Sequence, residues 1–301
     1  MEFQMKKIAR LIFNKMPWSV RDNVEFYRRF GRFPNISQPK SFNEKVIHRK
    51  RYACLSDENF PMLADKYRVR EYVAKRVGEE YLIPLLAHYD DVQRFSQDIG
   101  TLENCVVKPN HGAGMVKLIS HKPQKQEADE IVQEAARWLK TDFSKTCGEY
   151  HYSKIDRKIL VEKRIGNGVS ALTDYKFHLF RQPDGSIFYV LQLIDDRFEG
   201  ELSRTFYVND LSTVYSGKNA LDSQLMPLVE KGLALSIELL GYLEYARVDW
   251  YIDGGKLYFG EITLTPAAGF GTGYGETLDS LMGDKWHLQA PQARPREAEF
   301  A

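Results

Sequence analysis

The residues best suited to chemistry lie between positions 245 and 269, where charged side chains alternate with apolar ones. Arg247 and Asp249 are two residues apart on one predicted strand, and Glu261 and Thr263 are two apart on the next. Because successive side chains of a strand point to opposite faces, the two residues of each pair lie on one face of their strand. Two carboxylates and a guanidinium can hold Mg²⁺ and a phosphate, because hard cations prefer carboxylate oxygens and Arg matches phosphate oxygens. The alternative is a buried Arg–Asp ion pair beside an unrelated glutamate.

The register of this hairpin decides whether the two carboxylates can share a metal ion. A two-residue turn at Gly254-Gly255 would pair Asp249 with Gly260 and send Glu261 to the opposite face. We therefore expect an odd register, in which Asp249 lies opposite Glu261 and all four polar side chains share the cleft face. A three-residue loop would produce it, and so would an extra bulge residue in a longer loop.

The three-residue loop has further consequences along the hairpin. It places Tyr251 opposite Phe259 and Arg247 opposite Thr263. Unbroken alternation along the second strand would also put Leu257 and Phe259 on the face of Glu261.

A lysine followed by small residues forms a second candidate site. Lys108 ends an apolar strand, residues 110–114 form a loop with two glycines, and residues 115–120 return as a strand. Such a loop can cover phosphates with its backbone N–H groups. The spacing is not that of a Walker A motif, and no helix follows the loop directly. The alternative is a simple hairpin turn.

Two further strands carry polar residues at period two. Glu162 shares a face with Arg164, and the strictly alternating strand 174–180 places Asp174, Lys176 and His178 together. Such a pattern is most often the solvated face of a sheet. His178 has no metal-ligating neighbour in the sequence, so we interpret it as structural or substrate-facing.

Helices must position these strands. Residues 61–77 have helical spacing and Gly78 follows, which predicts one helix with Lys66, Arg68 and Arg70 on a solvated face near its start. Ser41 and Glu44 form a capping-box pair at the start of another helix. Residues 124–139 and 222–240 predict helices that cover the sheets.

Composition limits the class of protein. The chain has 301 residues with 42 Lys plus Arg against 41 Asp plus Glu, a net charge of +1, which gives no global sign of nucleic-acid binding. The 3 cysteines are far apart and lack metal-ligand spacing, so we expect a reduced, cytoplasmic setting. No run of apolar residues is long enough to span a membrane.

The two ends of the chain carry no candidate chemistry. Residues 3–18 combine apolar residues with lysines and an arginine. They predict either a helix packed on the body, which we favour, or peripheral contact with the inner face of a membrane. Residues 289–301 lack apolar periodicity and are predicted to be disordered.

The order of these parts resembles the ATP-grasp superfamily, in which ATP is held between two α+β lobes. More narrowly, the chain is similar to teichuronopeptide-biosynthesis-like (TupA-like) ATP-grasp proteins. The resemblance covers roughly residues 24–285. The matching motifs are Ala-Asp-Lys-Tyr-Arg-Val-Arg-Glu-Tyr-Val, Lys-Pro-Asn-His-Gly, Asp-Tyr-Lys-Phe and Tyr-Phe-Gly-Glu-Ile-Thr-Leu-Thr-Pro.

The resemblance implies roles for matching residues. The phosphates of ATP would meet Lys66 and Lys108, under a loop that contains His111, Gly112 and Gly114. Adenine would meet Glu162 and the backbone of Lys163 and Ile165, while Asp174 would bind the ribose and Lys176 belongs to the same nucleotide set. Mg²⁺ would be held by Asp249 and Glu261. Thr263 stands where the superfamily commonly has Asn as a further metal ligand. A Thr hydroxyl is a poorer ligand than an amide carbonyl, which puts the binding of a second Mg²⁺ in question. Arg247 would stabilise the transferring phosphoryl group, and Arg197 could serve the γ-phosphate.

The implied fold is α+β, with an N-terminal helical extension at 1–60, lobes at 61–155 and 156–288, and a tail at 289–301. The implied activity is an ADP-forming carboxylate–amine ligase that joins an amino acid or peptide to a uronic acid of a surface polysaccharide, such as a capsule, or its precursor. No protein nucleophile is needed, because phosphoryl transfer depends on positioning and charge neutralisation. A sugar kinase, a glycosyltransferase of polysaccharide assembly and a non-catalytic nucleotide-binding module remain open.

Overall fold

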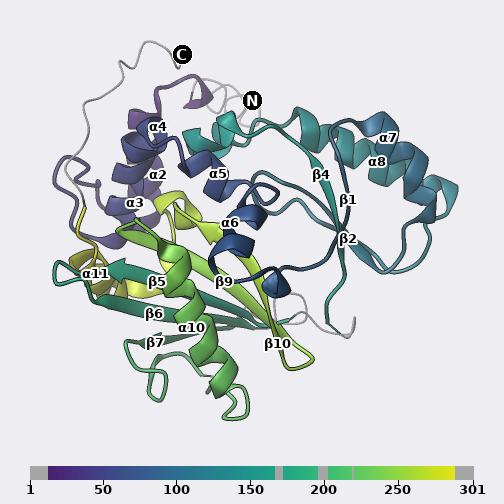
Figure 1. Cartoon of the computed structure of the whole chain (residues 1–301). Helices are drawn as coiled ribbons and strands as arrows, with labels where there is room; N and C mark the ends of the chain where they lie inside the picture. The colour runs from purple at the N-terminus through teal and green to yellow at the C-terminus, as the bar shows by residue number, and fades with distance from the viewer. Residues whose placement is uncertain (1–12, 167–171, 196–202, 219, 289–301) are drawn as a thin grey trace.

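The fold consists of two antiparallel sheets joined by helices (Figure 1). The computed structural model describes residues 13–166, 172–195, 203–218 and 220–288. A six-stranded sheet has the order β10-β9-β5-β6-β7-β8, and a four-stranded sheet has the order β1-β4-β2-β3. Residues 3–12 of the predicted N-terminal segment 3–18, the predicted tail 289–301 and Arg197 lie outside the described residues. At the described end of that segment, Pro17 precedes α2, which begins at Trp18.

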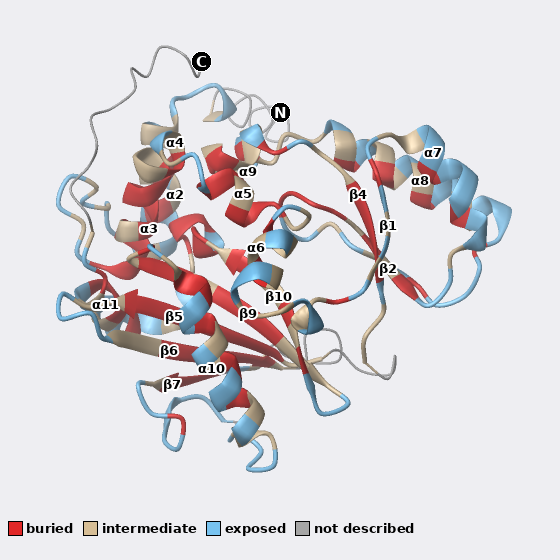
Figure 2. Ribbon diagram, viewed as in Figure 1, coloured by how far each residue is buried: buried red, intermediate tan, exposed pale blue. Residues whose placement is uncertain are grey.

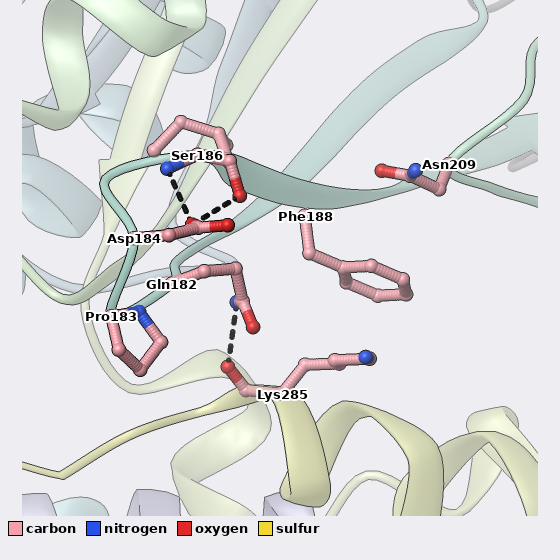
Figure 3. Close-up of a pocket in the computed structure, with 8 residues that line it drawn as sticks. Gln182, Pro183, Asp184, Ser186, Phe188, Asn209 and Lys285 are labelled. Carbon is pink, nitrogen blue, oxygen red and sulfur yellow. Dashed lines mark hydrogen bonds between the residues drawn. The ribbon is translucent and has the colours of Figure 1, made fainter.

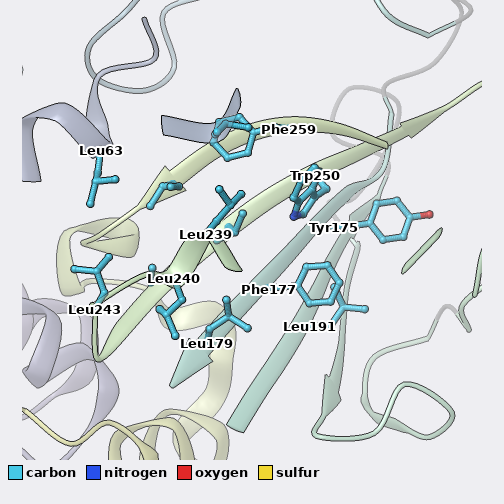
Figure 4. Close-up of a cluster of buried hydrophobic side chains, with 14 of the residues drawn as sticks. Leu63, Tyr175, Phe177, Leu179, Leu191, Leu239, Leu240, Leu243, Trp250 and Phe259 are labelled. Atoms are coloured by element: carbon cyan, nitrogen blue, oxygen red, sulfur yellow. The ribbon is translucent and has the colours of Figure 1, made fainter. Parts of the chain in front are cut away.

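The large sheet provides most of the hydrophobic core. Its strands are β5 (Asp174–Arg181), β6 (Ile187–Asp195), β7 (Ser203–Val208), β8 (Val214–Ser216), β9 (Tyr245–Asp253) and β10 (Lys256–Thr263). Helix α10 (Met226–Leu240) covers one face, where Phe177, Val248 and Trp250 are fully buried (Figure 4). Trp250 Nε1 donates a hydrogen bond to Ser236 Oγ of this helix at 2.7 Å. Apolar burial on this scale stabilises the fold by about 2 kcal/mol or more per large side chain.

Two helices cover part of the other face of the large sheet. They are α3 (Phe42–Arg51) and α11 (Gly275–Lys285), which share a core with Phe180 and Tyr245. Helix α2 (Trp18–Phe30) packs on α3, whereas α4 (Ala53–Ser56) and α5 (Phe60–Ala64) contribute to the core that α10 covers. The predicted capping box is confirmed at the start of α3, where Ser41 Oγ accepts from the Glu44 N–H and the Glu44 carboxylate accepts from the Ser41 N–H. Further along α3, the buried Arg49 donates to the carbonyls of Tyr245 and Leu264, which fixes α3 against β9 and the end of β10.

The small sheet has its own core. It contains β1 (Leu85–Tyr89), β2 (Cys105–Pro109), β3 (Lys117–Ile119) and β4 (Ile159–Lys163), covered on one face by α7 (Val92–Asp98) and α8 (Lys125–Lys140). The outer side of α8 is exposed (Figure 2). We assigned β4 to the C-terminal lobe, whereas it pairs with β1 and β2, so the chain leaves the small sheet only after Lys163.

The single helix predicted at 61–77 is wrong, because two helices occupy this region. Helix α5 ends at Ala64, and α6 (Val69–Arg76) begins five residues later. Between them, Asp65 is extended and its Oδ1 accepts hydrogen bonds from the N–H groups of Tyr67 and Arg68. A carboxylate that bonds local backbone N–H groups competes with the helix and starts a new one. Lys66 therefore lies on a break between helices.

The remaining helices are short. They are α9 (Ser144–Cys147) and the 3₁₀ turns η1 (Glu79–Tyr81), η2 (Ile99–Thr101), η3 (Tyr150–Lys154), η4 (Pro266–Gly269) and η5 (Thr272–Tyr274). Within the described residues, no helix is long and apolar enough to cross a membrane.

Candidate active site

The hairpin of β9 and β10 brings the predicted acidic residues together. Asp249 lies opposite Glu261 and Arg247 opposite Thr263, as expected. The three-residue loop is wrong, because the turn has two residues and Tyr251 pairs with Tyr258 instead of Phe259. The register shifts between Phe259 and Glu261, where Gly260 is the extra bulge residue.

This bulge also corrects the predicted faces of β10. Leu257 and Phe259 belong to the hydrophobic core with Ile262, whereas Glu261 takes the opposite face. A bulge inserts one residue and so reverses the alternation beyond it. The face of Arg247, Asp249, Glu261 and Thr263 is called the polar face below.

Arg247 is the centre of the polar face. Its Nε donates to Asp249 Oδ1 at 2.6 Å and its Nη2 to Asp249 Oδ2 at 2.7 Å, a bidentate pair. The same Nη2 lies 2.9 Å from Glu261 Oε1 and 2.9 Å from Thr263 Oγ1. The Arg–Asp ion pair that we considered as an alternative is present, but it shares its cation with Glu261. Glu261 is thus no unrelated neighbour.

The adjacent strand β5 adds a second cation. Lys176, opposite Asp249, donates to its Oδ2 and also lies 3.1 Å from Asp174 Oδ1. The three side chains are each at most 7% exposed. The solvated sheet face expected for Asp174, Lys176 and His178 is therefore wrong.

His178 belongs to the interior of the protein. Its ring is 0% exposed and bonded to Tyr245 Oη at 2.9 Å and Gln192 Oε1 at 3.3 Å. Burial lowers the pKa of His178, so the ring is neutral. These contacts favour the structural interpretation of this residue.

The charges of the polar face stabilise one another. Burial alone would lower the pKa of Arg247, but the carboxylates of Asp249 and Glu261 raise it. Burial would likewise raise the pKa of Glu261, but Lys66, Arg247 and Lys176 lower it. Both groups are therefore charged at neutral pH, as a phosphate- and metal-binding site requires.

Lys66 connects the polar face with the glycine loop. Its Nζ lies 3.3 Å from Glu261 Oε2 and donates to the carbonyl of Gly112 at 2.7 Å. The backbone N–H of Lys66 donates to the carbonyl of Asn110, and Asn110 Nδ2 donates to Asp65 Oδ1 at 2.8 Å. The break between α5 and α6 thus holds Lys66 against the loop that follows Lys108.

The glycine loop is shaped by its backbone. Gly112 and Gly114 have φ of 77° and 76°, values that favour glycine. His111 Nε2 lies 3.1 Å from the Thr141 carbonyl, and the side chain is 0% exposed. Burial lowers the pKa of His111 to about 4, so the ring is neutral and anchors the loop. Any phosphate contact of His111 is therefore left to its backbone.

Lys108 and Glu162 are adjacent on the small sheet. Lys108 Nζ lies 2.6 Å from Glu162 Oε2, and Arg70 Nη1 of α6 lies 3.6 Å from Glu162 Oε1. Arg70 also donates to the Ile83 carbonyl at 2.9 Å and is only 17% exposed, so its assignment to a solvated face is wrong. Sequence analysis missed this residue because no pattern connects α6 with β4.

The backbone that follows β4 joins the two sheets. The N–H of Lys163 donates to the Pro84 carbonyl at 2.9 Å, and the N–H of Gly166 donates to Asp253 Oδ2 at 2.9 Å. Lys163 is exposed and Ile165 half-buried. The N–H of Lys163 is thus already paired within the protein.

A surface pocket of about 460 Å³ lies at the opposite end of β5 and β6 from Asp174 (Figure 3). Phe188, Asn209 and Lys285 line it, together with the turn at 182–186. Asp184 Oδ1 accepts from Ser186 N–H and Oγ within this turn. The pocket contains none of the predicted site residues.

The donor set fits Mg²⁺ held jointly with a nucleotide. Among the described residues no group of three or more His, Cys, Asp or Glu side chains could hold a metal by itself. Mg²⁺ commonly takes one or two carboxylates and completes its shell with water and phosphate oxygens. Asp249 and Glu261, opposite each other at the register bulge, supply such a pair.

The chain belongs to the TupA-like ATP-grasp family, which matches residues 44–287. The fold is accordingly the α+β ATP-grasp fold. No curated protein sequence matches the chain significantly.

Solved structures similar to this chain include ADP-bound N5-carboxyaminoimidazole synthetase from Staphylococcus aureus, at 14% identity and a TM-score of 0.45, covering 76% of this chain and 53% of that one. D-alanine–D-alanine ligase from Helicobacter pylori is also similar, at 14% identity and a TM-score of 0.43, covering 75% and 62%. The chain therefore spans less than two thirds of the length of either protein.

Proposed function

We propose that this protein is an ATP-dependent ligase that joins a carboxylate to an amine through an acylphosphate. The observation that carries the proposal is the charge arrangement at the polar face. Arg247, Lys176 and Lys66 surround the two opposed carboxylates Asp249 and Glu261. Membership in the TupA-like ATP-grasp family supports the same assignment.

The chain's own residues would act by binding and orienting. Lys66 and Lys108, each now paired with a glutamate, would exchange those partners for phosphate oxygens. Asp249 and Glu261 would hold Mg²⁺, which neutralises phosphate charge during transfer. Arg247 would remain on Asp249 and donate to the transferring phosphoryl group.

The reaction needs no covalent intermediate on the protein. A substrate carboxylate attacks the γ-phosphorus and ADP leaves, which forms the acylphosphate. The amine then attacks the acyl carbon, the C–O bond breaks, and inorganic phosphate leaves with the electron pair.

Two acidic residues and a threonine would have positioning roles. Asp174 and Glu162 would position the nucleoside. Thr263, which donates to Glu261 Oε1 at 3.0 Å, would orient that carboxylate without binding a second Mg²⁺.

The substrate pair that we propose is a uronic acid, free or within a polysaccharide precursor, and an amino acid or peptide. Support comes from the family alone. The test incubates the protein with Mg-ATP and a panel of uronic acids and amino acids, and identifies products by mass spectrometry. We expect an amide, ADP and phosphate in equal amounts, dependent on both substrates. ADP formed with a neutral sugar alone would contradict the ligase and indicate a kinase.

A further inference from the structure

The small sheet and its helices α7 and α8 are called the small lobe here. The segment at 141–157 leaves the small lobe and returns to it. It follows α8 and precedes β4, which both belong to the small lobe, yet between them it packs on the N-terminal helices. Lys50 Nζ of α3 donates to the Cys147 carbonyl at 2.7 Å, and the rings of His151 and Phe60 meet edge to face. This excursion carries Glu149 to the end of the strand that bears Glu261.

Glu149 is a buried carboxylate with little to balance it. It is 7% exposed, and its Oε1 accepts a hydrogen bond from Thr265 Oγ1 at 2.5 Å. Among the described residues, no cation lies within ion-pair distance of it. Lys50, whose charge acts on Glu149, is committed to Asp22 at 3.0 Å. A buried carboxylate without a cationic partner is costly, so its presence favours a ligand that supplies a positive charge.

Glu149 also lies close to the proposed reaction centre. Thr265, its partner, follows Thr263 of the polar face by two residues. Burial raises the pKa of Glu149, Thr265 and Lys50 oppose that rise, and the negative charge of Glu261 adds to it. Burial raises the pKa of the Tyr152 phenol, and the charges of Glu149 and Glu261 add to this rise while Arg247 opposes it.

We propose that Glu149 receives the ammonium group of the amine substrate and takes up its proton as the nitrogen attacks. This rests on the proposed ligase function and adds the amine subsite to it. Two N–H bonds break on the way from the ammonium group to the amide. The first proton passes to Glu149, which frees the nitrogen lone pair to form the bond to the acyl carbon. Phosphate leaves with the C–O electron pair and takes up the second proton, and the proton on Glu149 later passes to solvent. Thr265 holds the other carboxylate oxygen and so fixes its direction.

The test separates the two half-reactions with two nucleophiles. In the first arm, D-glucuronate, Mg-ATP and hydroxylamine report the acylphosphate as a hydroxamate. Hydroxylamine is mostly neutral at pH 7.5 and needs neither an ammonium site nor a base. In the second arm, each protein amino acid is supplied as the amine and amide formation is measured.

We expect Glu149→Gln to retain hydroxamate formation and the KM for ATP. Amide formation should lose about 10- to 100-fold in kcat/KM for the amine, the effect of one charge-assisted contact. Glu149→Asp should recover part of this loss. Glu230→Gln, an exposed position on α10, should match the wild type in both arms.

Each outcome decides the matter. Equal loss in both arms, or no loss in the amide arm, would overturn the role of Glu149. Thr265→Val removes the hydrogen bond to Glu149 but keeps the carboxylate, so its rate of amide formation should fall less than that of Glu149→Gln. An equal fall would indicate that Glu149 has a structural role instead. A wild-type protein that forms no hydroxamate and no amide would refute the ligase itself, and the amine subsite would fall with it. Thermal unfolding midpoints establish that each variant is folded.

Discussion

Strand β9 has buried side chains on both faces, but the two faces differ in what they contribute. On β9, Val248 and Trp250 are 0% exposed on one face, and Asp249 between them is 2% exposed on the other. Val248 and Trp250 pack against other apolar side chains. Asp249 instead meets Arg247 and Lys176.

This difference separates stability from function. Apolar burial favours folding in proportion to area, whereas buried ion pairs lose in desolvation much of what they gain in attraction. The polar face therefore contributes little net free energy to folding. This is the physical reason for expecting it to bind a ligand. Substitutions on the apolar face should lower stability, and conservative substitutions on the polar face should lower activity.

Trp250→Ala should have the largest effect of the substitutions considered, and this effect should be a loss of stability. It removes a fully buried indole and its bond to Ser236, so we expect a loss of about 3–5 kcal/mol in the free energy of unfolding. Urea denaturation followed by circular dichroism measures this loss. A decrease below about 1 kcal/mol would mean that the apolar face is not the main source of stability.

Arg247→Lys should have the opposite effect to Trp250→Ala, because it should lower activity and leave stability nearly unchanged. A cation remains beside Asp249 and Glu261, so the unfolding midpoint should change little. The bidentate geometry is lost, and kcat for ADP formation should fall about 100-fold, or about 2.7 kcal/mol. Should stability fall as far as it does in Trp250→Ala while kcat is retained, Arg247 would be structural.

The same contrast explains what could be predicted from the sequence. Alternation along β9 identified both faces correctly, because period two is a local property of a strand. The odd register was predicted, but with a three-residue loop or a bulge in a longer loop, and not with a two-residue turn and a bulge at Gly260. Register depends on the partner strand, which local alternation does not reveal. An added Cβ at Gly260 would lie 3.1 Å from the Asp249 carbonyl oxygen, a close approach that no sequence pattern reveals.

Charged residues outside the hairpin were harder to assign. The break at Asp65 was missed because apolar periodicity continues through it, while the side-chain hydrogen bonds that start α6 leave no periodic signal. Glu149 was missed for a different reason. It is distant in sequence from Thr265, and only the path of 141–157 across the fold brings them together.

Lys108→Ala should weaken ATP binding with little effect on folding. The side chain is 19% exposed and paired with Glu162, which retains Arg70 after the substitution. We expect a loss of about 1.5–3 kcal/mol in ATP affinity, the value of one charge-assisted contact, measured by calorimetry. Lys75→Ala, at an exposed i,i+4 pair on α6, is the matched control and should bind ATP normally. Unchanged ATP affinity in Lys108→Ala would remove this lysine from the nucleotide site.

His111 extends the comparison to a buried group that is kept neutral. Burial lowers its folded-state pKa from 6.5 to about 4, and its ring anchors the glycine loop at the Thr141 carbonyl. Between these two values the unfolded chain binds a proton that the folded protein does not. The folded state therefore loses stability as the pH falls from about 6.5 towards about 4, by about 1.4 kcal/mol per pH unit for this one residue.

His111→Gln removes that titration, and the measurement is a difference between two pH profiles of unfolding free energy. Other titrating groups contribute to both profiles and cancel, so the variant should be shallower by about 1.4 kcal/mol per pH unit between pH 5 and 6. His121→Gln, on an exposed loop residue, should leave the slope of the wild type unchanged. Parallel profiles for His111→Gln and the wild type would show that the pKa of His111 is the same in the folded and unfolded states, so that burial does not keep the ring neutral. The glycine loop would then gain a positive charge below about pH 6.5, where the side chain of His111 would join Lys66 and Lys108 as a phosphate ligand.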